Sequence, residues 1–572
     1  MNEHERPTRD DAPVTEETAE AALSRRKFLT AGAGGAAALL LAGPAAAQGH
    51  DHLHGPTAPP PVLPPEEQAR LAKLEAAYFE AFAEPPVISS RDGLCEATLR
   101  VVEVPVNIPE PTGARVELTR TYNGMVPGPT FKVVAGDSLR IHLINELPKN
   151  SDPNCPPQEH SQPHCFNTTN LHFHGLHVSP QSPSDDVFVE VPPLAEDPYN
   201  GEFHYCVTLP DFHKPGTHWY HAHKHGSTAI QLENGMAGAL IVEDPNGQKP
   251  GPAGCKDLIF IIQEVVGQQA VTIYNCVAGG DPTPSVTFNV NGKYKPTLTA
   301  RPGEVQRWRF INATGTPRGV TPLELLSASV DAALQLIAVD GIYLPAPRFV
   351  SQWEISPGNR ADFFVRFPST GTYIVRKAAQ TLPPFAPAQD LAVVQVAGPP
   401  VSHALPTSLP PLPQYLTPIS EVEKNTTQPP DRVVTFDVDL SLPSCAGRFK
   451  VDGMPFDPHG KPIEVKLGKT ELWEIRNNST AAHPFHIHIN PFMVVNVNNV
   501  PVPLSQRFWQ DTVSIPANGF VRFVSRFENF PGKFVLHCHI LVHEDWGMMR
   551  AVEVIGDGYG PCQKVTTPLP KA

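Results

Sequence analysis

The pattern of hydrophobic and polar positions divides the chain into a short N-terminal part and a long β-rich remainder. Within residues 65–84, apolar side chains recur at helical spacing, which predicts one helix. Beyond about Thr98, short apolar alternations end at Gly, Pro or Asn, as strands do. We therefore expect the chain to consist mainly of short strands joined by turns.

A weak internal repeat organises this β-rich part. Each copy begins at an Asn-Gly or Asp-Gly pair and ends at an asparagine, and the copies run over residues 123–145, 291–312 and 452–477. One β-rich unit therefore occurs three times. We expect an export signal at 1–47, a His/Pro-rich linker with one helix at 48–97, and domains at 98–248, 249–400 and 401–572.

Composition narrows the fold class. The 572 residues include 66 prolines and 41 glycines, and this proline content is more than twice the usual share of about 5 %. Proline breaks helix interiors and is kept out of central strands, which excludes a long helical bundle. A hydrophobic content of 41 % excludes global disorder. The prediction is an all-β protein with three consecutive sandwich or barrel domains.

The charge balance bears on partners. A net charge of −14 argues against a nucleic-acid partner and against attachment to an anionic membrane surface. We expect neither nucleic-acid binding nor an integral membrane protein, and we expect a monomer. The 24 histidines make metal chemistry the leading question.

The N-terminus predicts export. Residues 24–29 read Ser-Arg-Arg-Lys-Phe-Leu, and an apolar stretch from Leu29 to Leu41 and three alanines at 45–47 follow. This order is typical of an export signal, and the apolar stretch is too short and glycine-rich to span a bilayer well. The paired arginines favour twin-arginine export over an ordinary secretory signal, so we expect a periplasmic or extracellular protein.

An exported protein can form disulfides. Eight of the nine cysteines are available for up to four bridges, and the pairing stays open: Cys95, Cys155, Cys165, Cys206, Cys255, Cys276, Cys445 and Cys562. The ninth, Cys538, lies between two histidines and is a candidate metal ligand.

Four His-x-His motifs carry the chemistry, and they lie at residues 172–174, 221–223, 486–488 and 537–539. Side chains i and i+2 of a strand share a face, so each motif presents two imidazoles side by side. Eight imidazoles suit a small metal cluster rather than a single ion. Between Gly226 and Pro458 the only histidine is His403, so the middle domain is expected to be scaffold or a substrate wall.

Cys538 must point to the strand face opposite its two neighbours. Together with His483, His543 and a weak thioether, it makes a His₂Cys set with a long axial methionine, the arrangement of a blue-copper centre. The chain would thus place an electron-accepting copper and a histidine cluster back to back.

With all four motifs in order over roughly residues 100–556, the chain resembles a multicopper oxidase of the three-domain, laccase-like type. The resemblance implies three consecutive cupredoxin-like Greek-key β-sandwich or barrel domains and four copper ions: one type 1, one type 2 and two type 3. It implies type 1 ligands His483, Cys538, His543 and axial Met548, whereas Met549 is expected to pack. It implies His172 and His486 at type 2, His174, His221 and His539 at one type 3 copper, and His223, His488 and His537 at the other.

Two carboxylates are candidate proton donors. Glu544, directly after His543, matches an acidic residue that delivers protons during oxygen reduction in similar enzymes. Reduction of dioxygen at a buried cluster consumes four protons, so a nearby carboxylate is chemically reasonable. Asp185 or Asp186 is the second candidate, and Asp185 is preferred.

Other histidines are interpreted as structural. His218 falls on the strand face opposite His221, and His177 and His225 are given the same role. The tail histidines His50, His52 and His54 could collect copper but are better explained as an unstructured tail. The group Cys155, His160, His164 and Cys165 imitates a zinc site, but a polar loop closed by disulfides explains it better.

The expected reaction couples four one-electron oxidations of phenolic or aromatic-amine donors to reduction of dioxygen to two waters. The partners are thus a small-molecule electron donor and dioxygen. The first alternative is a cuprous oxidase in copper tolerance, which the seven methionines disfavour. A copper-free structural protein of the same fold is disfavoured by the complete ligand set, and a two-domain nitrite reductase by the third repeat.

Overall fold

The computed structural model describes residues 80–569, with a few gaps. Those gaps are Thr112, Pro153, Gln158, Gln248, 268–273, 275–286, 328–332, 381–385, Gln414, 417–421 and 423–427. The expected export signal, the tail histidines at 50–54 and most of the predicted helix lie outside the described residues. All described residues belong to one unit of the chain, Pro56–Ala572.

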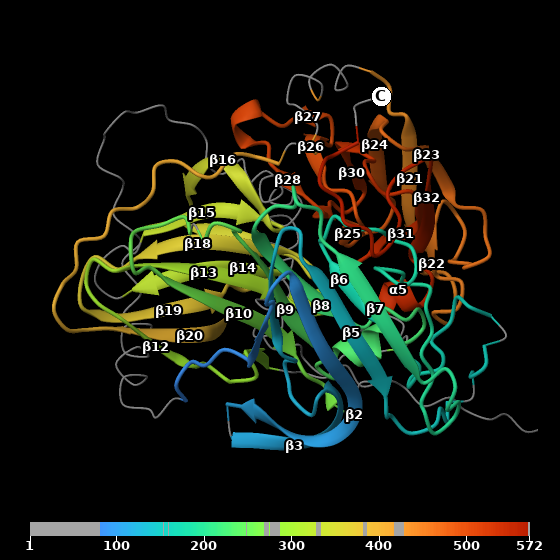
Figure 1. Ribbon diagram of the computed structural model, residues 1–572, viewed down its shortest axis with the longest axis horizontal. Helices are drawn as coiled ribbons and strands as arrows, with labels where there is room; N and C mark the ends of the chain where they lie inside the picture. The colour runs from blue at the N-terminus through green and yellow to red at the C-terminus, as the bar shows by residue number, and fades with distance from the viewer. Residues whose placement is uncertain are drawn as a thin grey trace, which may run out of the picture. The chain divides into compact units, whose positions relative to one another are not determined.

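Three sets of strands follow one another along the chain (Figure 1). The first region comprises β1 (Val87–Ser89), β2 (Leu94–Glu110), β3 (Gly113–Tyr122), β4 (Thr130–Val134), β5 (Ser138–Asn145), β6 (His172–His174), β7 (Glu202–Thr208), β8 (Gly216–His221), α3 (Thr228–Leu232) and β9 (Ala237–Glu243).

The middle region contributes no His-x-His motif but has strands of the same kind. It comprises β10 (Lys256–Glu264), β11 (Phe288–Val290), β12 (Thr297–Ala300), β13 (Val305–Asn312), the 3₁₀ turn η2 (Pro317–Gly319), β14 (Thr321–Ser327), β15 (Ala333–Val339), β16 (Ile342–Phe349), β17 (Gln352–Ile355), β18 (Arg360–Arg366), β19 (Gly371–Lys377) and β20 (Gln389–Val396).

The last region carries the second pair of motifs. It comprises β21 (Arg432–Val438), β22 (Phe449–Val451), β23 (Ile463–Lys466), β24 (Thr470–Asn477), β25 (His483–Ile487), β26 (Phe492–Val497), β27 (Val500–Pro501), η3 (Leu504–Gln506), β28 (Trp509–Gln510), β29 (Thr512–Ile515), β30 (Gly519–Arg526), β31 (Gly532–Cys538), α5 (Leu541–Asp545) and β32 (Met549–Ile555).

Each region folds as two sheets with one shared topology. In one sheet a parallel pair is extended by an antiparallel strand: β2-β5-β7, β10-β13-β18 and β21-β24-β30. In the other, the series are β4-β9-β8, β12-β20-β19 and β23-β32-β31. The fold is therefore the expected series of three cupredoxin-like β-sandwiches. The sheets change between residues 243 and 256 and between 396 and 432, and the domain limits within those gaps stay predictions.

The sequence repeat has a direct structural cause at its final asparagine. Asn145, Asn312 and Asn477 end equivalent strands and are buried. Each side-chain amide donates to two or more backbone carbonyls, and each Oδ1 accepts the amide of the residue two positions later. Buried backbone groups need hydrogen-bond partners, and at the end of each of these strands the asparagine side chain supplies them.

The first residues of each copy form a tight turn. Asn123-Gly124, Asn291-Gly292 and Asp452-Gly453 all have positive φ at both positions. Two consecutive left-handed residues are typical of a type I′ hairpin turn, for which Asn-Gly and Asp-Gly are the favoured pairs.

Each sandwich has its own apolar core, and a fourth cluster joins the regions. This cluster packs Trp219 of the first region, Ile261 of the middle region and Leu541 of the last. The regions thus meet at an apolar interface, beside which the His-x-His motifs lie.

The N-terminal expectations need two corrections. The predicted helix does not reach Glu84. Ala81 instead forms a β-bridge with Thr297, and the side chain of Phe82 packs on Phe260. Strands also begin before residue 98, at Val87, inside the expected linker. Helical spacing failed there because tertiary pairing with β12 competes with local preference.

Among the described residues, no helix combines the length and apolar character that a membrane span requires.

Candidate metal centre

The first region brings four imidazoles together on two paired strands. His172 and His174 project from one face of β6, and the antiparallel register places His172 opposite His221 at the end of β8. His223 follows two residues later, and its backbone amide donates to Asn170 Oδ1 at 2.8 Å.

The last region builds its four imidazoles in the same way. His486 on β25 is opposite His537 on β31, and His488 and His539 continue the two strands. The same register places Phe485 opposite Cys538, on the other face. One strand pair therefore presents imidazoles on one side and the thiol on the other, because side chains alternate along a strand.

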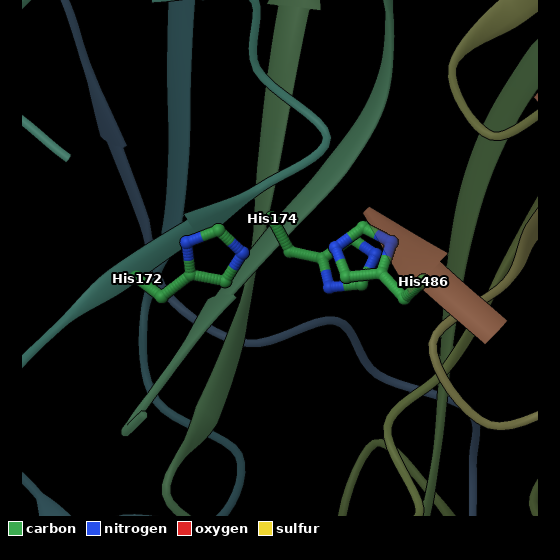
Figure 2. A group of neighbouring side chains, drawn as sticks. All are labelled: His172, His174 and His486. Carbon is green, nitrogen blue, oxygen red and sulfur yellow. The ribbon is translucent and has the colours of Figure 1, made fainter. Parts of the chain in front are cut away.

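The two sets of four meet at the interface between the regions. His174 stacks on His486 with ring centroids 3.9 Å apart, and His172 stacks on His488 at the same distance (Figure 2 shows His172, His174 and His486). Three groups have ligand atoms within 4.8 Å of one another: His172/His174/His486, His174/His221/His539 and His223/His488/His537. No side chain of the eight is more than 1 % exposed.

The imidazole nitrogens fit metal ions better than they fit one another. Nε2 of His537 lies 3.2 Å from Nε2 of His223 and 3.4 Å from Nε2 of His488. His172, His174, His221, His486 and His539 each have at least one buried nitrogen with no hydrogen-bond partner. Buried polar atoms are rarely left unpaired, so several lone pairs converging on one space indicate metal coordination.

Electrostatic effects favour the neutral form of the cluster imidazoles His172, His221, His223 and His539. Burial, and then repulsion from the neighbouring imidazoles, lowers the pKa of His172, His221 and His539 well below the usual value. Burial also lowers the pKa of His223 to about 4, against a partial opposing effect of Glu544. A neutral imidazole has the free lone pair that a metal ion requires.

A second group lies on the opposite face of the β25–β31 pair. Nδ1 of His483 is 3.4 Å from Sγ of Cys538, Nδ1 of His543 is 3.7 Å from the same sulfur, and the two nitrogens are 3.3 Å apart. The three atoms form a triangle of two nitrogens and one sulfur. Such a His₂Cys triangle fits the trigonal plane of a blue-copper site.

Neighbouring residues orient this triangle. Nε2 of His483 lies 2.7 Å from Oγ of Ser479, a bond that leaves Nδ1 free toward the sulfur. Phe449 stacks on His543 at 4.3 Å between centroids. Met548 is fully buried in the same core, and its carbonyl accepts the Cys538 amide at 3.1 Å.

The two groups differ in access to solvent. His543 is half-buried, whereas His483 and Cys538 are buried completely. Cys538 is bonded on either side to His537 and His539, so a single residue joins the triangle to the eight-histidine cluster.

Two buried carboxylates contact the histidine cluster. Glu544 Oε2 lies 3.0 Å from Nδ1 of His537, and Glu544 Oε1 lies 3.5 Å from Nδ1 of His223 and accepts a hydrogen bond from Thr228. Asp185 Oδ1 lies 3.0 Å from Nδ1 of His172. Burial raises the pKa of both carboxyl groups.

Asp186, the alternative to Asp185, is placed differently. It is half-buried, and its Oδ1 accepts the Phe188 amide at 3.0 Å. Of the two neighbouring aspartates, the structure therefore brings only Asp185 against a cluster histidine.

The middle region supports the cluster through a charge that sequence reasoning missed. Arg360, fully buried on β18, donates to both carboxylate oxygens of Asp511 at 2.8 and 2.6 Å. The carbonyl of Asp511 accepts Nδ1–H of His486 at 2.9 Å. Burial favours the neutral form of Asp511, but the Arg360 guanidinium holds the pKa of this carboxyl well below its usual range.

Two glycines show how tightly these parts fit. A Cβ on Gly175 would lie 2.0 Å from Arg360 Nη2, and one on Gly358 would lie 2.6 Å from Cδ2 of His539. The middle region thus directly contacts residues 172–175, which contain the first His-x-His motif, and the cluster histidine His539. No pattern near Arg360 signals this role, because the contact depends on how three regions pack.

The remaining histidines lie outside these groups. His218 is buried 5.5 Å from the ring of His213, and His177 stacks on Tyr415 at 4.5 Å. His225 donates from Nε2 to the carbonyl of His160 at 2.7 Å. These contacts agree with structural roles.

The disulfides decide between a zinc site and a disulfide-closed loop for the group Cys155, His160, His164 and Cys165. Cys155 and Cys165 form a disulfide, which removes both thiolates from a zinc site, and Cys206 pairs with Cys562. Cys95 and Cys255 are free thiols, so fewer than the four possible disulfides form.

Comparisons with known proteins agree with this geometry. Three family profiles, each described as multicopper oxidase, match residues 107–152 with 163–247, residues 257–399 and residues 412–557, which is well over half of the chain. A multicopper oxidase of Staphylococcus aureus is 26 % identical over 441 residues, covering 76 % of this chain and 84 % of its own length.

Two further relatives span most of the chain. A laccase of Bacillus stratosphericus is 27 % identical over 493 residues, covering 76 % of this chain and 90 % of its own. The solved structure of a Campylobacter jejuni multicopper oxidase, described as a metallo-oxidase, superimposes with a TM-score of 0.65. It is 22 % identical and covers 84 % of this chain and 96 % of that one, a likeness of fold.

Proposed function

The chain belongs to the multicopper oxidase family, whose members are copper-dependent oxidoreductases, and from that premise we propose a laccase-type reaction. Four one-electron oxidations of phenolic or aromatic-amine donors are coupled to reduction of one dioxygen to two waters. The observation that carries this proposal is the pairing of a half-buried His₂Cys triangle with a fully buried eight-histidine cluster, joined through Cys538.

Four copper ions are assigned to the two groups. His483, Cys538 and His543 would hold the type 1 ion, and the buried Met548 is the fourth candidate ligand. His172 and His486 would hold the type 2 ion, while His174, His221 and His539 would hold one type 3 ion and His223, His488 and His537 the other. Bound copper supplies the one-electron redox chemistry that neither imidazole nor carboxylate possesses.

The protein separates the donor from the cluster. The donor contacts the half-exposed side of His543, the one ligand of the triangle that solvent reaches. The eight cluster histidines are shielded from donor-sized molecules because none is more than 1 % exposed. A donor therefore needs only to touch the surface at His543, which favours a broad range of small aromatic donors.

Two carboxylates are assigned to proton supply. Glu544 and Asp185 each lie close to the Nδ1 of a cluster histidine, and burial raises the pKa of both, that of Glu544 to about 7, which favours the protonated form of each carboxyl group. Such a group can donate during oxygen reduction. Nδ1 of His172 is within hydrogen-bond distance of Asp185, and Nδ1 of His537 donates to the carbonyl of Cys538 at 3.1 Å, so both imidazoles keep Nε2 free for metal.

The remaining assignments rest on the sequence. The paired arginines at 25–26 support twin-arginine export to the periplasm or the outside of the cell, and we assign a monomer. The natural donor is taken to be a small organic molecule rather than cuprous ion, since the chain has only seven methionines.

Oxygen uptake by the copper-loaded protein tests the reaction. We expect uptake with a substituted phenol and an aromatic amine, at a ratio of four electrons to one dioxygen and without accumulation of hydrogen peroxide. Cuprous ion held in a stabilising chelate is the comparison donor. Oxygen uptake with cuprous ion but not with the phenol or the aromatic amine would favour a cuprous oxidase over a laccase. Oxygen uptake with none of these donors would contradict both functions.

A further inference from the structure

A second cluster of metal-binding side chains lies on the surface of the first region. His142 on β5 is directly opposite His204 on the antiparallel strand β7, and their rings stack with centroids 4.1 Å apart. Glu202 precedes His204 by two residues and therefore shares its face of the sheet. The potential ligand atoms of the three side chains lie within 4.8 Å of one another.

This face of the strand pair looks outward. The alternate residues Ile141, Leu143 and Tyr205 are buried in the core, so the three polar side chains point to solvent. The side chain of His142 is 30 % exposed and that of Glu202 is 45 % exposed. An ion can reach this cluster without opening the fold.

A hydrogen bond between His142 and Glu202 holds a nitrogen and an oxygen ligand atom side by side. Nε2 of His142 lies 2.7 Å from Oε2 of Glu202. A zinc ion bonded to one nitrogen and one oxygen takes distances of about 2.0–2.2 Å to each, so it fits between these atoms with a small opening of the pair. Nearby arginines do not compete for Glu202, since Arg140 faces Glu96 at 3.9 Å and Arg100 pairs with Glu146.

We propose that His142, Glu202 and His204 form a surface site for a divalent transition-metal ion of the Zn²⁺ or Cu²⁺ type, separate from the four coppers. Two imidazoles and one carboxylate are the ligands these ions prefer, whereas Mg²⁺ and Ca²⁺ prefer oxygen alone. The remaining coordination positions belong to water. An ion there cross-links β5 to β7, two strands that no metal of the oxidase reaction touches.

Zinc titration of the full-length protein, loaded with copper and then dialysed against a mild chelator that removes copper held outside the oxidase centre, tests this site. Zn²⁺ is redox-silent, so its uptake is counted by equilibrium dialysis and elemental analysis while the copper content and blue absorption report that the oxidase centre is intact. The parent protein should bind one more Zn²⁺ per chain than H142A or H204A. Loss of a ligand should weaken the site by more than the roughly 10–100-fold that an outer-sphere partner contributes.

The H459A variant is the matched control. His459 is an exposed histidine of the last region, so its removal should leave zinc uptake unchanged. Equal zinc uptake by the parent, H142A and H204A would overturn the proposal, as would a loss confined to H459A. Because the count is a difference between variants, histidines elsewhere cancel, and a failure here leaves the oxidase assignment untouched.

Discussion

The type 1 triangle and the eight-histidine cluster share strands β25 and β31 but are held in different ways. All four proposed type 1 ligands come from the last region, between His483 and Met548. The cluster takes four histidines from the first region and four from the last, and the middle region supports it through Arg360. The triangle is thus a property of one sandwich, whereas the cluster exists only when three regions pack together.

This difference between the triangle and the cluster explains why the middle region, which supplies no proposed copper ligand, is still part of the metal centre. Arg360 is fully buried and pairs with Asp511, whose backbone orients His486. Breaking one side of a buried ion pair leaves an uncompensated charge in the interior. The middle region therefore acts as an electrostatic support for the interface cluster and has no equivalent at the triangle.

The largest effect is expected from Cys538→Ser, which removes the one residue that both groups share. Loss of the thiolate should abolish blue absorption and turnover and should leave the cluster's coppers bound, as measured by absorption, oxygen uptake and elemental analysis. Cys95→Ser, at a buried free thiol of the first region, should retain colour and activity. Turnover without blue absorption in Cys538→Ser would contradict electron transfer from the triangle to the cluster through this residue.

Acid should empty the cluster more steeply than the triangle. Since the folded-state pKa of His223 and His483 is about 4, against 6.5 for an ordinary histidine, protons bind the unfolded chain and compete with metal as pH falls. Stability is therefore full above pH 6.5 and declines between about pH 6.5 and 4.

When it loses its metal as a unit, the cluster exposes eight imidazoles to protonation, against two imidazoles and one thiolate in the triangle, which gives the cluster the steeper dependence. Copper retained by each group, followed by electron paramagnetic resonance and blue absorption during acid titration, measures the two slopes. Equal slopes would remove this distinction.

Arg360→Ala should damage the cluster selectively. We expect destabilisation of about 3–5 kcal/mol and loss of cluster copper with the blue colour retained, because Asp511 is left buried without its partner. Arg360→Lys keeps the positive charge and should therefore lose less cluster copper than Arg360→Ala. It also serves as the test variant if Arg360→Ala does not fold. Arg366→Ala, at the exposed end of the same strand, is the control. Equal loss of type 1 and cluster copper would refute selective support.

Glu544→Gln should slow oxygen reduction by roughly 10²–10⁴-fold, the usual contribution of a positioned proton donor. Reduction of the type 1 site by the donor should keep its rate, since the carboxylate of Glu544 lies against the cluster histidines His537 and His223. Stopped-flow measurement separates the two steps. Asp186→Asn, beside the second carboxylate, should change neither, and an unchanged oxygen step in Glu544→Gln would remove its proton role.

Ser479→Ala is expected to have the smallest effect. It deletes the hydrogen bond to Nε2 of His483, worth about 1 kcal/mol, and should shift the type 1 absorption and reduction potential while cluster signals stay constant. Thr480→Ala at the exposed neighbouring position is the control. A change in the cluster spectrum would indicate that the two groups are not held separately.

Sequence alone was sufficient for the parts of this account that depend on strand periodicity. The alternation of side chains predicts the paired imidazoles and the opposite-facing Cys538, and the repeated Asn-Gly and terminal Asn residues predict three related sandwiches. Asp185 could be preferred over Asp186 from the sequence, but its contact with His172 required the fold.

Contacts made by packing across regions could not be predicted in this way. Arg360 and Asp511 are 151 positions apart, and neither belongs to a metal-ligand motif. The helix expected up to Glu84 failed for the same reason, since pairing with Thr297 is not visible in local spacing.

The central claim is that one chain holds a His₂Cys copper and a separate histidine-bound cluster. A copper count with visible and electron paramagnetic resonance spectra of the purified, copper-loaded protein tests it most directly. The account predicts about four coppers per chain, intense blue absorption and distinct type 1 and type 2 signals. One copper or none, or a colourless protein, would contradict it.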